Sequence, residues 1–267
     1  MISLAARTAR QLPAILSVRD VCLSFGGIAA LDGISFDIFE GEILGLIGPN
    51  GAGKTTLFNC LSRLYTPSSG DILFEGRSLL QRAPHRIAEI GIGRTFQNVA
   101  LFDRLSVRDN VLVGAHARSA GDFASDALRL PWAARCEARL SRKAHLLIEE
   151  LDLSDVAEAP AGVLPFGTRK RVELARALAS EPKLLLLDEP ACGLNHDEVR
   201  ALGDLIGHLC GARKLTVLLV EHHMGLVMSV SDRVVALNFG RKIADGVPGE
   251  VRAHPDVIRA YLGGEAA

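Results

Sequence analysis

A glycine-rich segment near position 50 has the residue types and the spacing that bind phosphate. Gly48 is followed by four residues and then by Gly53, Lys54 and Thr55, which matches G-x-x-x-x-G-K-[ST]. The apolar run before it predicts a buried strand and the residues after it predict a helix over 55–64, so a chance glycine-rich turn is disfavoured. Glycines let backbone N–H groups approach phosphate oxygens, the helix start adds positive potential, and Lys54 adds a full charge. We expect a nucleoside triphosphate to bind Gly48, Pro49, Asn50, Gly51, Ala52, Gly53, Lys54, Thr55 and Thr56.

Two adjacent acids end a second apolar run, 184–187. Alternate strand residues point to opposite faces, so Asp188 and Glu189 cannot share one role. We expect Asp188 to hold Mg²⁺ together with the Thr55 hydroxyl, and Glu189 to polarise the attacking water as a general base. Two acids at the end of an apolar strand are common and do not by themselves indicate catalysis. They indicate it here because they follow a phosphate-binding loop in the same α/β chain.

Composition limits the class of protein. The 267 residues are 48% hydrophobic and 23% charged, an ordinary globular balance that excludes long disorder and coiled coil. Thirty basic against 31 acidic residues give a net charge of −1, so we expect no nucleic acid partner. No apolar run approaches the ~20 residues of a membrane span, and we expect the chain to be soluble alone. The five cysteines form no C-x-x-C pair, which disfavours a zinc site or a disulfide framework.

The order of predicted elements indicates an α/β fold with a mainly parallel core sheet, an N-terminal antiparallel β subdomain and a helical insertion. Early strands are predicted over 16–25, 34–38, 71–74 and 77–80. Later helices and strands alternate, and they end in a hairpin around Phe239 and Gly240. The later predictions are helices over 168–179 and 197–209, strands over 183–187 and 215–220, and hairpin strands over 234–237 and 242–245.

In the segment between the early strands and the later alternating elements, apolar residues recur at helical spacing. Ser106 and Asp109 resemble a capping box that starts a helix running through Val111. A second helix, 132–151, places Leu140, Ala144, Leu147 and Leu151 on one face, as core packing requires. We therefore expect an extension over 1–15 and one domain over 16–267, in which 16–98 and 163–267 form the nucleotide-binding core and 99–162 a helical subdomain.

With these motifs in place, the chain resembles the ABC-type ATPases, the nucleotide-binding subunits of membrane transporters, from residue 16 to residue 263. The resemblance implies a P-loop NTPase fold that hydrolyses ATP with Mg²⁺. Gln97 resembles the Q-loop glutamine, which touches Mg²⁺ and water and senses the membrane partner. His222 resembles the switch histidine at the γ-phosphate, and it joins Glu189 and Gln97 as a catalytic residue. Phe25 stands where the family stacks an aromatic ring on adenine, although a core phenylalanine is the alternative.

The signature loop departs from the family pattern. In the family this loop reads Leu-Ser-Gly-Gly-Gln, belongs to the opposite subunit and closes over the γ-phosphate. Three of its five positions differ here, and the serine is replaced by Pro165. Three further departures are Asn195 and His196 in the D-loop and His223 after the switch histidine. The segment of this chain at the position of the signature loop is Leu164, Pro165, Phe166, Gly167 and Thr168.

Several short sequence segments resemble one branch of the family, the larger ATPase subunit of branched-chain amino-acid importers. They lie at 93–98, 101–107, 193–195, 220–224 and 255–263. The resemblance implies a second ATPase subunit, two multispan permease subunits and, indirectly, an extracytoplasmic solute-binding protein as partners. The place of action would be the cytoplasmic face of the inner or plasma membrane. Relatives of this branch handle amides, urea or aromatic acids, so the cargo is inferred by analogy.

Three alternatives stay open at this point. A lipid or lipopolysaccharide exporter ATPase shares the core motifs, but would lack the long insert around residues 121–142 and the Arg-Thr-Phe before Gln97. A non-transport ABC protein acting on nucleic acid or ribosomes would carry two ATPase domains, a coiled coil or a basic stripe. A P-loop kinase or GTPase has no reason to carry Gln97, a signature-like segment and His222 in this order.

The signature loop yields a first prediction. Without the serine hydroxyl, ATP-driven pairing of two subunits should persist but be weaker by about 1.5–3 kcal/mol, the contribution of one hydrogen bond to a charged group. Pro165→Ser should therefore strengthen ATP-dependent dimerisation, measured by sedimentation of a hydrolysis-deficient chain with and without ATP. An unchanged nucleotide dependence would contradict this account.

Overall fold

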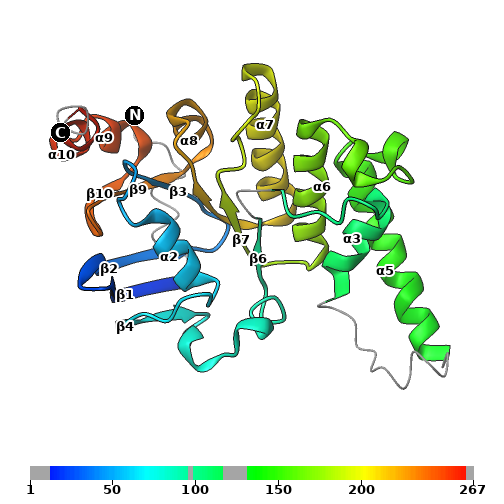
Figure 1. Ribbon diagram of the computed structural model, residues 1–267, viewed down its shortest axis with the longest axis horizontal. Coiled ribbons are helices and arrows are strands. Elements are labelled where there is room, and N and C mark those ends of the chain that lie inside the picture. The colour runs from blue at the N-terminus through cyan, green and yellow to red at the C-terminus, as the bar shows by residue number, and fades with distance from the viewer. Residues whose placement is uncertain (1–12, 96–98, 117–130, 263–267) are drawn as a thin grey trace. The chain divides into compact units, whose positions relative to one another are not determined.

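The computed structural model describes residues 13–95, 99–116 and 131–262, with side chains from residue 135 in the last range. The chain divides into two compact units (Figure 1). The first unit comprises residues 1–87 and 184–267, and the second comprises residues 88–183. The second unit contains the whole segment 99–162 that we expect to form the helical subdomain. Each unit is described by itself below.

The first unit begins with an antiparallel sheet in the order β2-β1-β4-β5. This sheet confirms the expected N-terminal β subdomain. The strand predicted over 77–80 is too long, because the chain leaves the sheet after Ser78. The Ser78 hydroxyl accepts a hydrogen bond from the Leu80 N–H at 3.2 Å and donates one to Asp71, which starts a 3₁₀ turn. The strands are β1 (Ala14–Phe25), β2 (Ile28–Phe39), β4 (Ser69–Phe74) and β5 (Arg77–Ser78).

The second sheet is mainly parallel, as predicted. Its strands in the first unit follow the order β10-β9-β3-β8-β7, in which only β10 pairs antiparallel. Every residue of β3, β7 and β8 is buried, which is typical of strands covered on both faces. The strands are β3 (Ile43–Ile47), β7 (Leu184–Asp188), β8 (Thr216–Val220), β9 (Arg233–Asn238) and β10 (Arg241–Gly246).

Helix α2 (Lys54–Leu61) contacts β2 of the first sheet and β7 of the second (Figure 1). It ends three residues before the predicted position, because Ser62 donates its hydroxyl to the Phe58 carbonyl and Arg63 takes a left-handed φ of +60°. Helix α8 packs on β3, where Gly45 leaves room for Val227: a Cβ on Gly45 would lie 2.6 Å from that side chain. The remaining helices of this unit are α7 (His196–Arg213), α8 (Met224–Val230), α9 (Pro248–Arg252) and α10 (Pro255–Leu262).

The described residues of the second unit, 88–95, 99–116 and 131–183, form helices and a short strand. Helix α3 packs against both α5 and α6, and a Cβ on Gly114 would lie 1.9 Å from the Arg176 carbonyl oxygen. Ser106 caps α3 as predicted, with its hydroxyl accepting from the Asp109 N–H at 3.0 Å. These elements are β6 (Ile92–Arg94), α3 (Val107–Ala115), α5 (Pro131–Glu150) and α6 (Phe166–Ala179), with 3₁₀ turns at Ser154–Val156 and Ala161–Val163. Two further 3₁₀ turns, Leu79–Gln81 and Pro84–Arg86, belong to the first unit.

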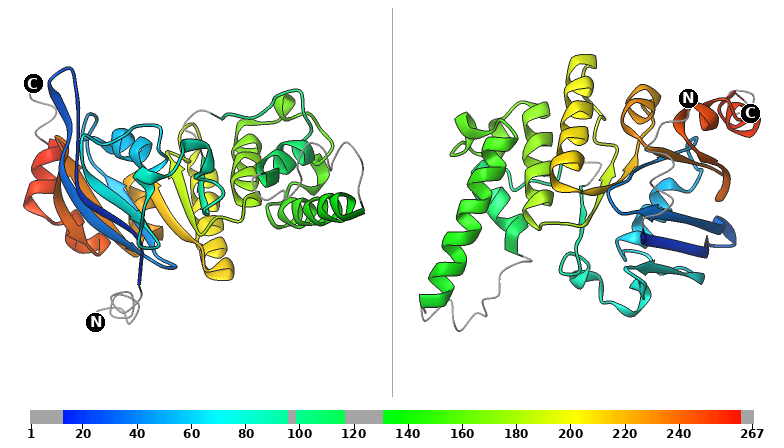
Figure 2. Two further views of the ribbon diagram at one scale, coloured as in Figure 1. Left: turned by 90° about the horizontal axis from the view of Figure 1, so that it is seen from below. Right: turned by 180° about the vertical axis from the view of Figure 1, so that it is seen from behind.

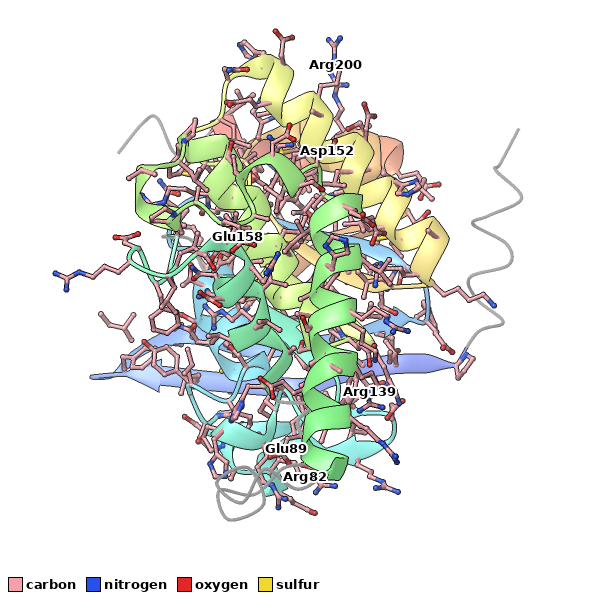
Figure 3. All side chains as sticks on the ribbon, turned by 90° about the vertical axis from the view of Figure 1, so that its right-hand side faces the viewer. Arg82, Glu89, Arg139, Asp152, Glu158 and Arg200 are labelled. Carbon is pink, nitrogen blue, oxygen red and sulfur yellow. The ribbon has the colours of Figure 1, made fainter. Side chains whose placement is uncertain are left out.

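Helix α5 buries the predicted apolar stripe. Ala144, Leu147 and Leu151 are at most 4% exposed, and Leu140 is half-buried. Arg139, beside this stripe, is exposed at the side of the helix (Figure 3). Among the described residues, every helix is too short or too polar to cross a membrane.

Candidate nucleotide-binding site

The register of the parallel sheet brings three functional segments to one edge. Leu46 of β3 and Asp188 of β7 both pair with Val220 of β8, which lies between them. The glycine-rich loop follows β3, the segment with His222 follows β8, and Glu189 follows β7. Because carboxyl ends of neighbouring parallel strands meet at the same edge, these segments converge at the position where open α/β sheets bind ligands.

Lys54 is held within the glycine-rich loop. Its Nζ donates hydrogen bonds to the Gly48 carbonyl at 2.6 Å and to the Pro49 carbonyl at 3.0 Å, and the residue is only 8% exposed. Burial lowers the pKa of Lys54, while the nearby Glu189 carboxylate acts in the opposite direction. A cationic group in such a buried position is stabilised further by an anionic ligand.

The start of α2 suits an anion. Its N-cap is Gly53, which offers no side chain to bond the free N–H groups, and its first turn contains no acidic residue. Gly53 has φ +99°, and a Cβ there would lie 2.6 Å from the Ala30 carbonyl oxygen. Of the following residues, Thr55 is exposed and Thr56 half-buried. The loop therefore has the free N–H groups and the cation that a phosphate requires.

The turn between β9 and β10 is hydrogen-bonded to the glycine-rich loop. The Gly240 N–H donates to the Ala52 carbonyl at 3.1 Å, and the Gly240 carbonyl accepts from the Asp32 N–H at 2.8 Å. Backbone hydrogen bonds thereby join β2 and the glycine-rich loop to the hairpin turn, and Arg241 adds an ion pair with Asp32 of β2.

The predicted carboxylates occupy different environments. Asp188 is 4% exposed at the end of β7, whereas Glu189 has a left-handed φ of +46° and its N–H donates to the Val220 carbonyl at 2.8 Å. This conformation costs a non-glycine residue about 1–3 kcal/mol, so it persists only where the surrounding structure holds the backbone. The His222 Nδ1 lies 3.7 Å from the Glu189 Oε2, and the His222 side chain is 61% exposed. The structure thus brings Glu189 and His222 together.

Sequence reasoning missed Glu221, a buried acid beside the predicted histidine. Glu221 has 0% exposure, and its carboxylate accepts from the N–H groups of Ala191 (2.7 Å), His222 (3.0 Å) and His223 (3.1 Å). One carboxylate therefore ties the turn after β7 to the segment after β8. An acid directly before His222 at the end of an apolar run was the available signal.

Phe25 is not a core residue. It is 47% exposed at the end of β1, and its ring meets Tyr65 edge-to-face at 5.3 Å between ring centres. Tyr65, which the sequence did not single out, thus adds a second exposed aromatic ring beside the predicted one. Gln97 lies outside the described residues.

The sequence of this chain matches a family of known proteins. The sequence profile of the family described as "ABC transporter" matches residues 31–192. The chain belongs to the ABC transporter family of ATP-binding subunits. A second profile, "Branched-chain amino acid ATP-binding cassette transporter", matches residues 241–267.

Individual members of the family resemble the chain along most of its length. The high-affinity branched-chain amino acid transport ATP-binding protein BraF of Pseudomonas aeruginosa is 42% identical over 249 residues, 93% of this chain and 98% of BraF. LivG of Escherichia coli, with the same description, is 41% identical over the same shares. The crystal structure of an ATP-binding cassette of an ABC transporter in its ADP conformation matches with a TM-score of 0.82 at 29% identity, over 94% of this chain and 99% of the other.

Two departures from the family pattern keep a structural role as helix caps. The His223 Nδ1 accepts from the Leu226 N–H at 3.3 Å, which caps α8 as the family's aspartate could. Asn195 caps α7 in a capping box with Glu198. His196 and His223 meet edge-to-face and help to line a groove of about 730 Å³ between α7 and α8.

The signature segment lies in the second unit. Helix α6 begins at Phe166, with Pro165 at its N-cap and no side-chain capping bond. Pro165 and Phe166 are exposed, Leu164, Gly167 and Thr168 are half-buried, and the Lys170 Nζ lies 5.7 Å from the centre of the Phe166 ring. The absent capping group follows directly from the replacement of the family's serine by proline.

Glu221→Gln should reduce ATP hydrolysis more than it reduces ATP binding. The amide keeps one acceptor oxygen but turns an –NH₂ group toward backbone donors, which should cost about 1–3 kcal/mol in unfolding free energy and misplace His222. Denaturant unfolding, equilibrium ATP binding and steady-state ATPase measurements test this. Glu40→Gln, at an exposed position before β3, is the matched control, and equal activity of the two variants would contradict the assignment.

Proposed function

We propose that this chain is the ATP-binding and hydrolysing subunit of an importer for branched-chain amino acids or related small polar solutes. The observation that carries the proposal is the likeness to BraF and LivG over 93% of the chain, together with the match of residues 241–267 to the branched-chain profile. The subunit does not itself contact cargo, so its own site supports the ATPase role and the likeness supports the cargo class.

The glycine-rich loop binds the triphosphate of ATP in this proposal. The free N–H groups at the start of α2 and the Lys54 ammonium bind the β- and γ-phosphates. The exposed Phe25 and Tyr65 rings offer a stacking surface for adenine. Thr55, Asp188 and Gln97 would hold Mg²⁺, which when bound neutralises charge on the phosphate oxygens.

Glu189 acts as the general base and His222 as its partner at the γ-phosphate. The Glu189 carboxylate accepts a proton from water as the water oxygen bonds to the γ-phosphorus, and the bond from that phosphorus to the bridging oxygen breaks, so that ADP leaves. Glu221 holds the backbone that presents His222. The 3.7 Å separation between His222 Nδ1 and Glu189 Oε2 supports a joint role. Gln97 would complete the catalytic set and connect it to the membrane partner.

Two ATPase subunits share each site in this proposal. The signature segment of one chain covers the glycine-rich loop of the other, presenting the Gly167 N–H and the positive start of α6 to the γ-phosphate. The second subunit is another copy or a paralogue, and both drive two multispan permeases at the cytoplasmic face of the membrane. An extracytoplasmic solute-binding protein delivers the cargo.

Glu189→Gln should lower the ATPase rate by about 10²–10⁴-fold, because a general base typically contributes that factor. ATP binding should be retained, since the glycine-rich loop is unchanged. Lys54→Ala should abolish ATP binding, because it removes the only full positive charge of the loop. Phosphate release and equilibrium ATP binding measure the two effects, with Glu40→Gln as control. Full activity of Glu189→Gln would refute the assigned base.

Purification of this chain from its native membranes in mild detergent tests the importer assignment. Two multispan permeases, with a second ATPase or an amino-acid-binding protein, are the expected companions. The binding protein should then bind branched-chain amino acids in calorimetry. Companions of an exporter, or nucleic acid and ribosomal proteins with no membrane protein, would overturn the importer assignment and leave the ATPase chemistry standing.

A further inference from the structure

The last helix of the chain reaches the glycine-rich loop. Helices α9 and α10 follow β10 and pack on the β9–β10 hairpin (Figure 2). Val257, which is 3% exposed, and Tyr261 are four residues apart and so lie on the same face of α10. Leu262, on another face, is 70% exposed. Tyr261 therefore lies on the inward side of α10.

The Tyr261 hydroxyl makes a direct bond to the first residue of the loop. The Gly48 N–H donates to the Tyr261 Oη at 2.9 Å, although the two residues are far apart in sequence. Burial raises the pKa of Tyr261, and the bond from Gly48 acts in the opposite direction. The hydroxyl is therefore neutral at ordinary pH, and its oxygen is an acceptor.

Gly48 links this hydroxyl to the phosphate-binding lysine. Its carbonyl accepts from the Lys54 Nζ at 2.6 Å, so Tyr261 and Lys54 bond the N–H and the C=O of one residue. Gly48 is buried, and a Cβ there would lie 2.3 Å from the Leu237 carbonyl oxygen, so no residue with a side chain fits at this position. An error in its orientation would pass directly to Lys54.

We propose that Tyr261 is a positioning residue for nucleotide binding, which orients Gly48 so that the Gly48 carbonyl holds Lys54 toward the phosphates. This assigns a role to the C-terminal segment 241–267, which contains no other predicted site residue and whose described part, 241–262, forms β10, α9 and α10. The inference rests on the proposed assignment of the glycine-rich loop to ATP, and it deepens that assignment by adding a residue that does not touch the nucleotide.

Tyr261→Phe isolates the hydroxyl, because phenylalanine keeps the ring and its packing. We expect the dissociation constants of ATP and ADP to rise about 2- to 12-fold, which corresponds to one neutral hydrogen bond. KM for ATP should rise by a similar factor while kcat changes less than about twofold, since the catalytic carboxylate is untouched. Deuterium exchange should increase in the peptide that contains Gly48 and remain unchanged in α10.

The matched control is Leu262→Ala, which alters the exposed face of the same helix. It should leave nucleotide affinity and the exchange of the Gly48 peptide unchanged. Equal affinities of Tyr261→Phe and the unmodified chain, or a uniform rise of exchange throughout α9 and α10 with a lower unfolding temperature, would overturn the positioning role. Failure of the unmodified full chain to bind ATP would instead overturn the proposed site, and the inference with it.

Discussion

The site depends on the register of three buried parallel strands. Leu46, Val220 and Asp188 pair across β3, β8 and β7, so the three segments that follow these strands begin at the same level. A shift of one residue in any of these pairings would turn its side chains to the opposite face of the sheet. All three strands are completely buried, so their apolar side chains are packed against neighbours on both faces. A shift would exchange the side chains of the two faces and disrupt this packing, which makes it costly.

Buried polar groups around the site are bonded mainly to the backbone. Lys54 donates to two carbonyls of its own loop, Glu221 accepts from three N–H groups, and Tyr261 accepts from one. Buried polar groups require such partners, and backbone partners place the main chain itself. This arrangement explains why the family's pattern at position 223 can change: a histidine still caps α8, which is what the backbone there requires.

Local sequence signals predicted the features that need only neighbouring residues. The glycine-rich loop and the Ser106 cap depend on contacts within a few positions, and both are present. The apolar stripe of α5 was predicted from its spacing, although its burial results from packing against α3 and α6. The prediction was less accurate at element ends. Ser78 and Ser62 stop a strand and a helix by side-chain bonds that hydrophobic periodicity does not report. Helix α8 was missed because it has only seven residues and a histidine as its cap.

The sequence by itself determined the chemistry of the site: a phosphate loop, a strand ending in Asp188 and Glu189, a histidine after the next strand, and the family that combines them. The tertiary structure placed two further residues beside these segments. Neither Glu221 nor Tyr261 belongs to the motifs from which the site was predicted, and each is linked to the site by hydrogen bonds from atoms distant in sequence. Spacing along the chain can encode a loop or a cap, but a bond between Tyr261 and Gly48 exists only once the sheet and its last helix have packed.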